Sequence, residues 1–315
     1  MRILVTGARG KVGAATVAAL LDAGHHVTAL DRTPPAYETP ASGAVAYLEG
    51  DLADAGQAFA AVRGQDAVIH AAAIPDPLHH APHVVFANNL MATFNVLEAA
   101  VRMGVGRVVH VSSETVPGFA FAERPFLASY APVDEEHPVR PQDPYALAKR
   151  FGEELCDATA DRSDVRCISI RPSWVQWEGN VERNLGPVVR GRGEEASPSF
   201  WSWIDADDLA EALRLAAESD LPGHEVLYIA SPDNATGLPL HDLVRRYHGD
   251  AVELRPVERP DASGISTAKA QRLLGWRPRR EWRDHLDGDG RLLPAARERL
   301  ERGETGVQRG RAATG

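Results

Sequence analysis

The segment RILVTGARGKVG, residues 2–13, decides the fold of this chain. An aliphatic run, 2–6, leads into glycines at positions 7, 10 and 13, and a helical pattern of alanine, valine and leucine follows to residue 22. Glycines at this spacing let the backbone turn tightly, approach a pyrophosphate and pack the helix against the strand. The helix N-terminus offers free N–H groups and a positive dipole end to phosphate. The segment therefore predicts a strand–turn–helix unit that binds a dinucleotide.

An acidic residue after the next strand supports this prediction. Asp31 ends the second apolar run, 26–31, and lies 18 positions after Gly13. A carboxylate at this place accepts hydrogen bonds from the adenosine ribose hydroxyls, which favours NAD. Arg9 and Arg32 can each pair with a 2′-phosphate, so the sequence does not exclude NADP.

Short apolar runs alternate with helical patterns through the first two-thirds of the chain. The runs lie at 2–6, 26–31, 45–48, 67–71, 107–112 and 165–170, and helical patterns lie at 11–22, 82–102 and 144–160. Near-continuous apolar strands joined by helices are typical of a parallel sheet that is covered on both faces. We expect an α/β fold with a Rossmann-type, doubly wound parallel sheet and a small C-terminal substrate-binding part.

The same patterns divide the chain. We assign residues 1–172 to the dinucleotide-binding Rossmann domain, to which 204–231 return. Residues 173–203, an irregular stretch rich in Gly, Pro, Arg and Trp, and residues 232–298 form the substrate-binding part. Residues 299–315 have no apolar periodicity, and we expect a disordered tail there.

Composition limits the class of protein. The 315 residues are 44% hydrophobic and 25% charged, enough to bury a core. Subtracting 44 acidic from 34 basic residues gives −10, which argues against nucleic-acid and anionic-membrane partners. The apolar runs are shorter than the roughly 20 residues of a membrane span. The N-terminus lacks a signal-peptide pattern, and two cysteines are too few for a disulfide framework, so we expect a cytoplasmic protein.

A second motif carries chemistry. Tyr145 and Lys149 are four residues apart in a predicted helix, so the phenol and the ammonium lie on one face. An ammonium beside a phenol lowers the phenol pKa and makes it a general acid/base for a hydroxyl/carbonyl pair. Ser113 ends a strand at the carboxyl edge of the sheet, where it can hydrogen-bond the reacting oxygen. We predict that Ser113, Tyr145 and Lys149 are catalytic. We expect no metal site, because the histidines at 79, 80 and 83 lack zinc-like partners.

Taken together, these motifs resemble the extended short-chain dehydrogenases/reductases, also called the NAD-dependent epimerase/dehydratase family. The resemblance covers about 1–280 and includes, in the family's order, the glycine loop, Asp51-Leu52, His70-Ala71-Ala72-Ala73, Asn88-Asn89, 112–118, 145–149, Arg171-Pro172, 203–208 and 274–278. It implies that Asp51 and Leu52 hold the adenine, that Ala71 and Ala72 line the cofactor, and that Lys149 also binds the nicotinamide ribose. The expected cofactor residues are Gly7, Gly10, Lys11, Val12, Gly13, Asp31, Arg32, Asp51, Leu52, Ala71, Ala72, Asn89, Tyr145 and Lys149.

Within the family, the layout resembles uronate and related sugar dehydrogenases, which oxidise free sugars with NAD. Glu114-Thr115 stands where dehydratases carry an Asp-Glu pair, and 173–203 is shorter than the nucleotide-clasping segment of 4-epimerases. The resemblance implies that Arg183 binds a substrate carboxylate, although a solvated loop arginine fits the sequence as well. Glu114 can bond sugar hydroxyls or repel an acid substrate, and Trp174 can stack on a sugar ring or pack under the irregular segment.

Three functions therefore stay open. The first is an NAD(P)-dependent oxidoreductase that acts on a hydroxyl of a sugar or sugar acid. The second is a nucleotide-sugar (UDP-sugar) 4-epimerase that keeps its NAD. The third is a non-catalytic NAD(P)-binding regulator, against which the intact Ser113, Tyr145 and Lys149 argue. We expect a small sugar-type substrate and a homodimer.

Overall fold

The computed structural model describes residues 1–33 and 43–314 and confirms the doubly wound sheet. Seven strands form one sheet in the order β10-β7-β5-β4-β1-β2-β3, and every neighbouring pair is parallel. The chain winds outward from β1 to β3 and then returns to place β4 on the other side of β1. This reversal makes a switch point beside β1, where ligands bind in such sheets.

The sheet strands are β1 (Arg2–Thr6), β2 (His26–Asp31), β3 (Val45–Glu49), β4 (Ala67–His70), β5 (Arg107–Val111), β7 (Arg166–Pro172) and β10 (His224–Ile229). The helices packed on it are α1 (Lys11–Asp22), α2 (Ala55–Val62), α3 (Pro82–Met103), α4 (Pro144–Arg162), α7 (Ala206–Glu218), α9 (Ala268–Leu274) and α11 (Gly306–Thr314). The remaining elements are β6 (Tyr130–Ala131), β8 (Trp174–Gln176), β9 (Trp203–Asp205), β11 (Glu253–Leu254), α5 (Val181–Asn184), α6 (Gly186–Gly191), α8 (Leu240–His248), α10 (Pro294–Glu301) and two 3-10 turns, Gly249–Ala251 and Trp282–Asp284.

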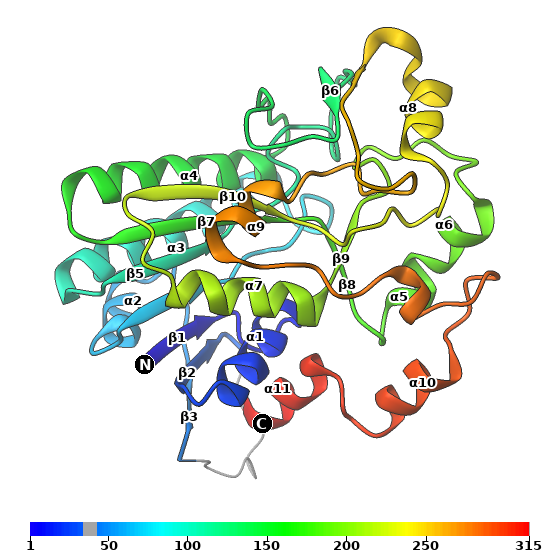
Figure 1. Cartoon of the computed structure of the whole chain (residues 1–315). Helices are drawn as coiled ribbons and strands as arrows, with labels where there is room; N and C mark the ends of the chain where they lie inside the picture. The colour runs from blue at the N-terminus through cyan, green and yellow to red at the C-terminus, as the bar shows by residue number, and fades with distance from the viewer. Residues whose placement is uncertain (34–42, 315) are drawn as a thin grey trace.

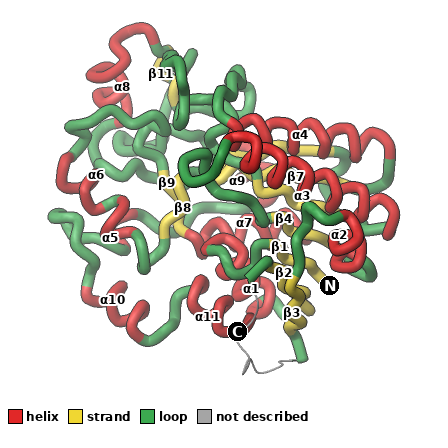
Figure 2. The backbone as a smooth tube through the Cα atoms, turned by 180° about the vertical axis from the view of Figure 1, so that it is seen from behind, coloured by secondary structure: helices red, strands yellow, loops and turns green. Residues whose placement is uncertain are grey.

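Helices cover both faces of the sheet (Figure 1), and a hydrophobic cluster lies between the helices and the sheet on each face. Because side chains alternate along a strand, Ile3 and Val5 join the cluster of α1, α7 and α9, whereas Leu4 joins that of α2, α3 and α4. The smaller elements gather beyond the carboxyl ends of the strands (Figure 2). They place a second body of protein over the edge at which β1, β4 and β5 end.

Residues 173–203 are more ordered than the sequence indicates. They contain β8, α5 and α6 and end in β9, which pairs in parallel with β8. Trp203 is fully buried and donates from Nε1 to Asp233 Oδ1 at 3.2 Å. Such short elements carry no periodic signal, so the sequence could not separate them from loop.

The expectation of a disordered tail is wrong for the described part of 299–315. The chain continues from α10 into α11, which packs on α1. A Cβ at position 310 would lie 1.7 Å from Ala14 O, so the two helices approach through a glycine. Contact through glycine backbone needs few apolar side chains, and this explains why the tail shows no apolar periodicity.

Helix α3 is long and apolar enough to cross a membrane, although we expected every apolar run to be too short. In the fold, half of its most apolar stretch of 18 residues is buried. It packs against α2 and α4 in the layer that covers the sheet. Its buried apolar residues belong to the hydrophobic core, whereas Val84, Met91 and Phe94 are exposed.

A buried ion pair ties α4 to the sheet. Glu153 in α4 is fully buried and accepts two hydrogen bonds from Arg171 of β7, at 2.7 Å each from Nε and Nη2. Ser112, which follows β5, donates to the same carboxylate at 2.7 Å. Arg150 adds a longer contact from Nη1 to Glu153 Oε2 at 3.4 Å. A buried carboxylate is tolerated only when its lone pairs are filled, and here four donors fill them.

Glu153→Ala should lower the free energy of unfolding by about 3–5 kcal/mol, because Arg171 would keep a buried charge without its partner. The neighbouring Glu154 pairs with Arg150 at the surface, so Glu154→Ala should cost about 0.5 kcal/mol or less. Urea denaturation of both variants measures the difference. Equal losses would show that the buried pair does not stabilise the fold.

Candidate active site

The glycine loop follows β1 and is shaped by close backbone approaches. Gly7 has φ +65°, and a Cβ there would lie 2.8 Å from Ala72 Cα. A Cβ at position 13 would lie 2.2 Å from Gly7 O. Gly10 caps α1 without a side-chain hydrogen bond, so no side chain of the cap occupies the amides of the first helical turn. Unfilled amides at a helix N-terminus fit the phosphates of a dinucleotide.

A cleft of about 480 Å³ opens at this loop and gathers most of the expected cofactor residues. They are Gly7, Gly10, Lys11, Val12, Gly13, Asp31, Arg32, Asp51, Leu52, Ala71 and Ala72. Asn89 does not line the cleft, because its amide is bonded to the backbone N and O of Ile74. Asn88, one residue earlier, lines the cleft instead. Thr33 also lines it, and no sequence pattern indicates this.

Asp31 connects the glycine loop to the end of β2. Its Oδ2 accepts from Arg9 N at 2.9 Å, and its Oδ1 accepts from Thr33 N at 3.1 Å. Each carboxylate oxygen has a second lone pair, which leaves room for ribose hydroxyls. Lys11 donates from Nζ to Val175 O at 2.9 Å, and burial together with nearby Arg183 lowers its pKa.

The structure brings Ser113, Tyr145 and Lys149 to one region at the end of β5. Asp143 caps α4 by accepting from the N–H groups of Tyr145 and Ala146, and this cap starts the helix just before the phenol. Tyr145 and Lys149 are both buried, and Lys149 Nζ lies 5.7 Å from the centre of the Tyr145 ring. Lys149 Nζ donates to Val111 O at 2.6 Å, which anchors the helix on the strand that leads to Ser113.

Burial, and not the lysine, dominates the proton affinity of the phenol. It raises the pKa of Tyr145 to about 12, with a hydrogen bond from Ser113 acting in the opposite direction. Burial also lowers the pKa of Lys149 to about 8, against the attraction of Glu153. The pKa of Tyr145 is therefore raised, and not lowered as expected from the neighbouring ammonium, because desolvation outweighs a charge 5.7 Å from the ring.

Glu114 is the carboxyl group nearest this region in the sequence. Burial raises its pKa to about 8, the nearby Ser173 opposes the rise, and its Oε2 has no hydrogen-bond partner. Below pH 8 this group is a neutral acid that can donate a hydrogen bond. It lines a small hollow together with Ser199 and Phe200.

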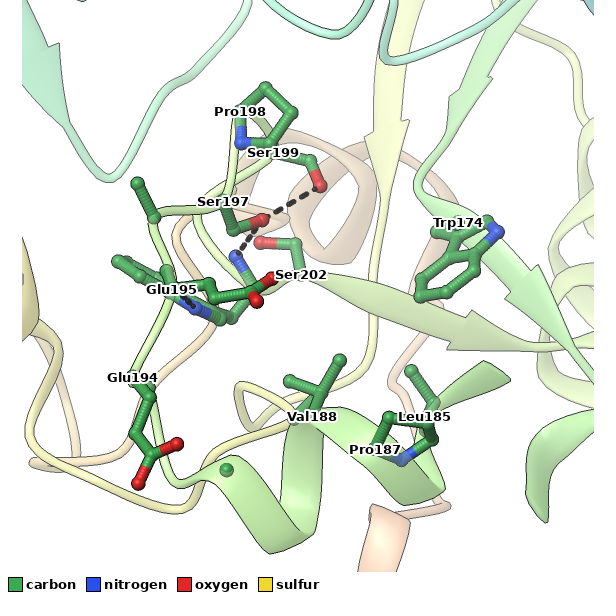
Figure 3. A pocket seen from close by; sticks show the side chains of 15 residues that line it. Trp174, Leu185, Pro187, Val188, Glu194, Glu195, Ser197, Pro198, Ser199 and Ser202 are labelled. Atoms are coloured by element: carbon green, nitrogen blue, oxygen red, sulfur yellow. Dashed lines mark hydrogen bonds between the residues drawn. The ribbon is translucent and has the colours of Figure 1, made fainter. Parts of the chain in front are cut away.

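Trp174 lines a separate pocket of about 320 Å³, which shares Ser199 with the hollow of Glu114. Figure 3 shows the Trp174 ring facing a strap that carries Ser197, Pro198 and Ser199, with Leu185, Pro187 and Val188 along one wall. The strap is held by Trp201, which donates from its backbone N to Ser197 Oγ and from Nε1 to Glu195 O. Trp201 has φ +56°, a left-handed conformation that residue type alone does not indicate.

Arg183 lies away from Trp174 and Glu114. It is exposed, donates from Nε to Asn184 Oδ1 at 3.3 Å, and lines a different cavity beside α10. Its positive charge contributes to the lowered pKa of Lys11 at the glycine loop. The structure therefore does not gather the three expected substrate residues around one pocket.

One buried cluster among the described residues offers metal-ligand atoms. Glu178, Asp205 and His285 place one such atom each within 4.8 Å of one another. The guanidinium groups of Arg280 and Arg299 contact Glu178 Oε1 at 3.3 and 3.1 Å. These cations neutralise the carboxylate, so the cluster is an ion-pair network that joins β8 and α7 to the C-terminal segments.

Comparison with known proteins agrees with this geometry. The sequence model of the NAD dependent epimerase/dehydratase family matches residues 3–230. L-arabinose 1-dehydrogenase (NAD(P)(+)) of Haloferax volcanii is 32% identical over 229 residues, which cover 70% of this chain and 84% of that protein. Uronate dehydrogenase of Pseudomonas putida is 29% identical over 238 residues, which cover 75% and 78%. A solved structure of MoeE5 with UDP-glucuronic acid and NAD superposes with a TM-score of 0.69 at 25% identity and covers 95% of this chain and 100% of that one.

Tyr145→Phe should lower turnover roughly 100-fold or more, because the variant keeps the ring and loses the proton-transferring hydroxyl. Binding of NAD, measured by calorimetric titration, should stay unchanged. Tyr130→Phe is the matched control, since Tyr130 is similarly buried and its hydroxyl bonds Asp134 outside the cleft. Near-normal turnover of Tyr145→Phe would remove the phenol from the mechanism.

Proposed function

Because the chain belongs to the NAD-dependent epimerase/dehydratase family, the extended short-chain dehydrogenases/reductases, we propose that it oxidises a hydroxyl group of a small sugar. The observation that carries the substrate assignment is the Trp174 pocket, which lies beyond the carboxyl edge of the sheet. Its volume of about 320 Å³ is at the lower end of ligand pockets, which suits one sugar ring better than a nucleotide sugar.

The chemistry is divided between the cofactor and three side chains. When bound at the glycine loop, NAD would supply the acceptor for the hydride that leaves the carbon bearing the reacting hydroxyl. Tyr145 takes the hydroxyl proton, Ser113 donates a hydrogen bond to the reacting oxygen, and Lys149 stabilises the charge on the phenol oxygen. The products are the carbonyl compound, NADH and one proton, so atoms and electrons balance.

The charges around the Trp174 pocket favour a neutral sugar. Its described lining contains Glu194 and Glu195 and no lysine, arginine or histidine. These carboxylates repel a sugar acid, whereas carboxylate and serine oxygens accept hydrogen bonds from sugar hydroxyls. Glu114, a neutral donor below pH 8, suits a sugar oxygen at the adjoining hollow.

A sugar acid is the second candidate, because uronate dehydrogenase is among the similar proteins and Arg183 is a cation near the glycine loop. In this alternative, Arg183 binds the carboxylate after moving toward the cleft. Arg183→Ala should then cost about 2 kcal/mol or more in kcat/KM on the acid and little on the neutral sugar. Arg190→Ala, which removes an exposed arginine of α6, is the matched control.

A substrate screen tests the proposal. The protein is incubated with NAD and neutral aldoses, the matching uronic acids or UDP-sugars, while NADH absorbance and the sugar products are followed. We expect NADH from a neutral aldose at a kcat/KM at least tenfold above that for its uronic acid. A preference for the acid that Arg183→Ala abolishes would favour the second candidate. Interconversion of UDP-sugars without net NADH would replace both with a 4-epimerase.

We also infer a cytoplasmic homodimer that pairs through α3 and α4. Val84, Met91 and Phe94 lie on one exposed face of α3, and Phe151 of α4 is 45% exposed beside them, with its ring against Phe86. Apolar side chains clustered on two neighbouring helices mark an interaction surface.

Sedimentation of the protein from the soluble extract should give a mass twice that of the chain. Phe94→Glu should reduce this mass to that of a single chain, because a carboxylate would then lie in the apolar surface. A monomer at micromolar concentration would contradict the dimer.

A further inference from the structure

The C-terminal helix α11 reaches the dinucleotide loop at one residue, Arg9. Arg311 in α11 donates from Nε to Arg9 O at 3.2 Å, and Arg9 donates from Nη1 to Thr314 O at 3.2 Å. The two hydrogen bonds run in opposite directions between the loop and the last turn of the helix. They fix both the backbone and the side chain of Arg9.

Arg9 lies at the adenosine end of the cleft. Its backbone N–H donates to Asp31, and its guanidinium lies 6.0 Å from the centre of the Tyr47 ring and hydrogen-bonds the Tyr47 hydroxyl. Arg9 lines the cleft together with Asp31 and Arg32. The 2′-position of the adenosine ribose, which carries a hydroxyl in NAD and a phosphate in NADP, is recognised by residues at this place.

The position of α11 depends on a close helix contact. Gly310 faces Ala14 of α1 so closely that any Cβ would meet the Ala14 carbonyl. Thr314 is buried, and its hydroxyl donates to Gly310 O at 3.1 Å, which holds the last turn together. Arg309 pairs with Asp22 at the far end of α1, away from the loop. The helix is therefore seated by Gly310 and reaches Arg9 through Arg311 and Thr314.

We propose that α11 is a determinant of cofactor selectivity: by holding the Arg9 guanidinium on the Thr314 carbonyl, it favours NAD over NADP. An arginine binds phosphate through the N–H donors of its planar guanidinium group. Because the Arg9 guanidinium already bonds the Thr314 carbonyl and the Tyr47 hydroxyl, it has fewer donors for a 2′-phosphate. Asp31 adds repulsion against the same phosphate. Displacement of α11 releases Arg9 and weakens the discrimination.

The ratio of the two dissociation constants isolates this effect. NAD and NADP share the pyrophosphate, so a change in loop order alters both affinities alike and cancels in the ratio. Loss of the Arg311 charge weakens the more negative NADP more than NAD, so it raises the ratio and cannot produce the expected fall. The inference rests on dinucleotide binding at the glycine loop and is independent of the sugar substrate.

The experiment uses the full chain with Gly310→Ala, the smallest change that displaces α11, and measures NAD and NADP dissociation constants by calorimetric titration. The unaltered protein should bind NAD more tightly. In Gly310→Ala the ratio of the NADP to the NAD constant should fall at least tenfold, and adding Arg9→Ala should cancel that fall. Arg309→Ala, which alters α11 away from the loop, should leave the ratio unchanged.

A second variant guards against a failure of Gly310→Ala to fold or to displace the helix. Arg311→Ala removes an exposed side chain and its bond to Arg9 O, and it should lower the ratio in the same direction. Hydrogen exchange of the amides at 306–314 reports whether α11 has been released. An unchanged ratio with a released helix, or a fall that persists after Arg9→Ala, would overturn the proposal. If the unaltered protein bound neither dinucleotide, the assignment of the glycine loop as a dinucleotide site would be refuted instead.

Discussion

The bidentate contact between Glu153 and Arg171 is the constraint on which the candidate active site depends. It fixes α4, which carries Tyr145 and Lys149, to β7, the strand that lies between β5 and the edge strand β10. Ser112 donates to the same carboxylate, so the neighbouring Ser113 is placed relative to that helix as well. A buried carboxylate needs all of these donors, because each unfilled lone pair would cost free energy. Stability and placement of the reactive groups therefore come from one network.

Desolvation is the main influence on the proton affinities of Tyr145 and Lys149. It holds the Tyr145 hydroxyl protonated and brings the Lys149 pKa to about 8, because a low-polarity environment disfavours both charged forms. A bound oxidised nicotinamide would bring positive charge to this site and would favour the phenolate. The proton affinity of Tyr145 would then depend on the protein and the cofactor together.

The strap beside the Trp174 pocket and the C-terminal helix α11 have no periodic pattern of apolar residues. The Trp174 pocket is closed by a strap in which Phe200 and Trp201 both have positive φ angles, held by side-chain and backbone hydrogen bonds. Helix α11 is seated through a glycine contact with α1. We propose that these two elements, and not the strands, set substrate and cofactor selectivity.

The sequence by itself determined the doubly wound sheet, the glycine loop, Asp31 at the end of β2 and the shared helical face of Tyr145 and Lys149. These features follow from local spacing, because the residues that favour a strand, a turn or a helix lie close together in the sequence. Only the tertiary structure decided that Asn88 lines the cleft in place of Asn89, that Arg183 lies apart from Trp174, and that the tail forms α11. These outcomes depend on contacts between segments far apart in the chain, on burial that sets each pKa, and on backbone approaches that leave no pattern in the sequence.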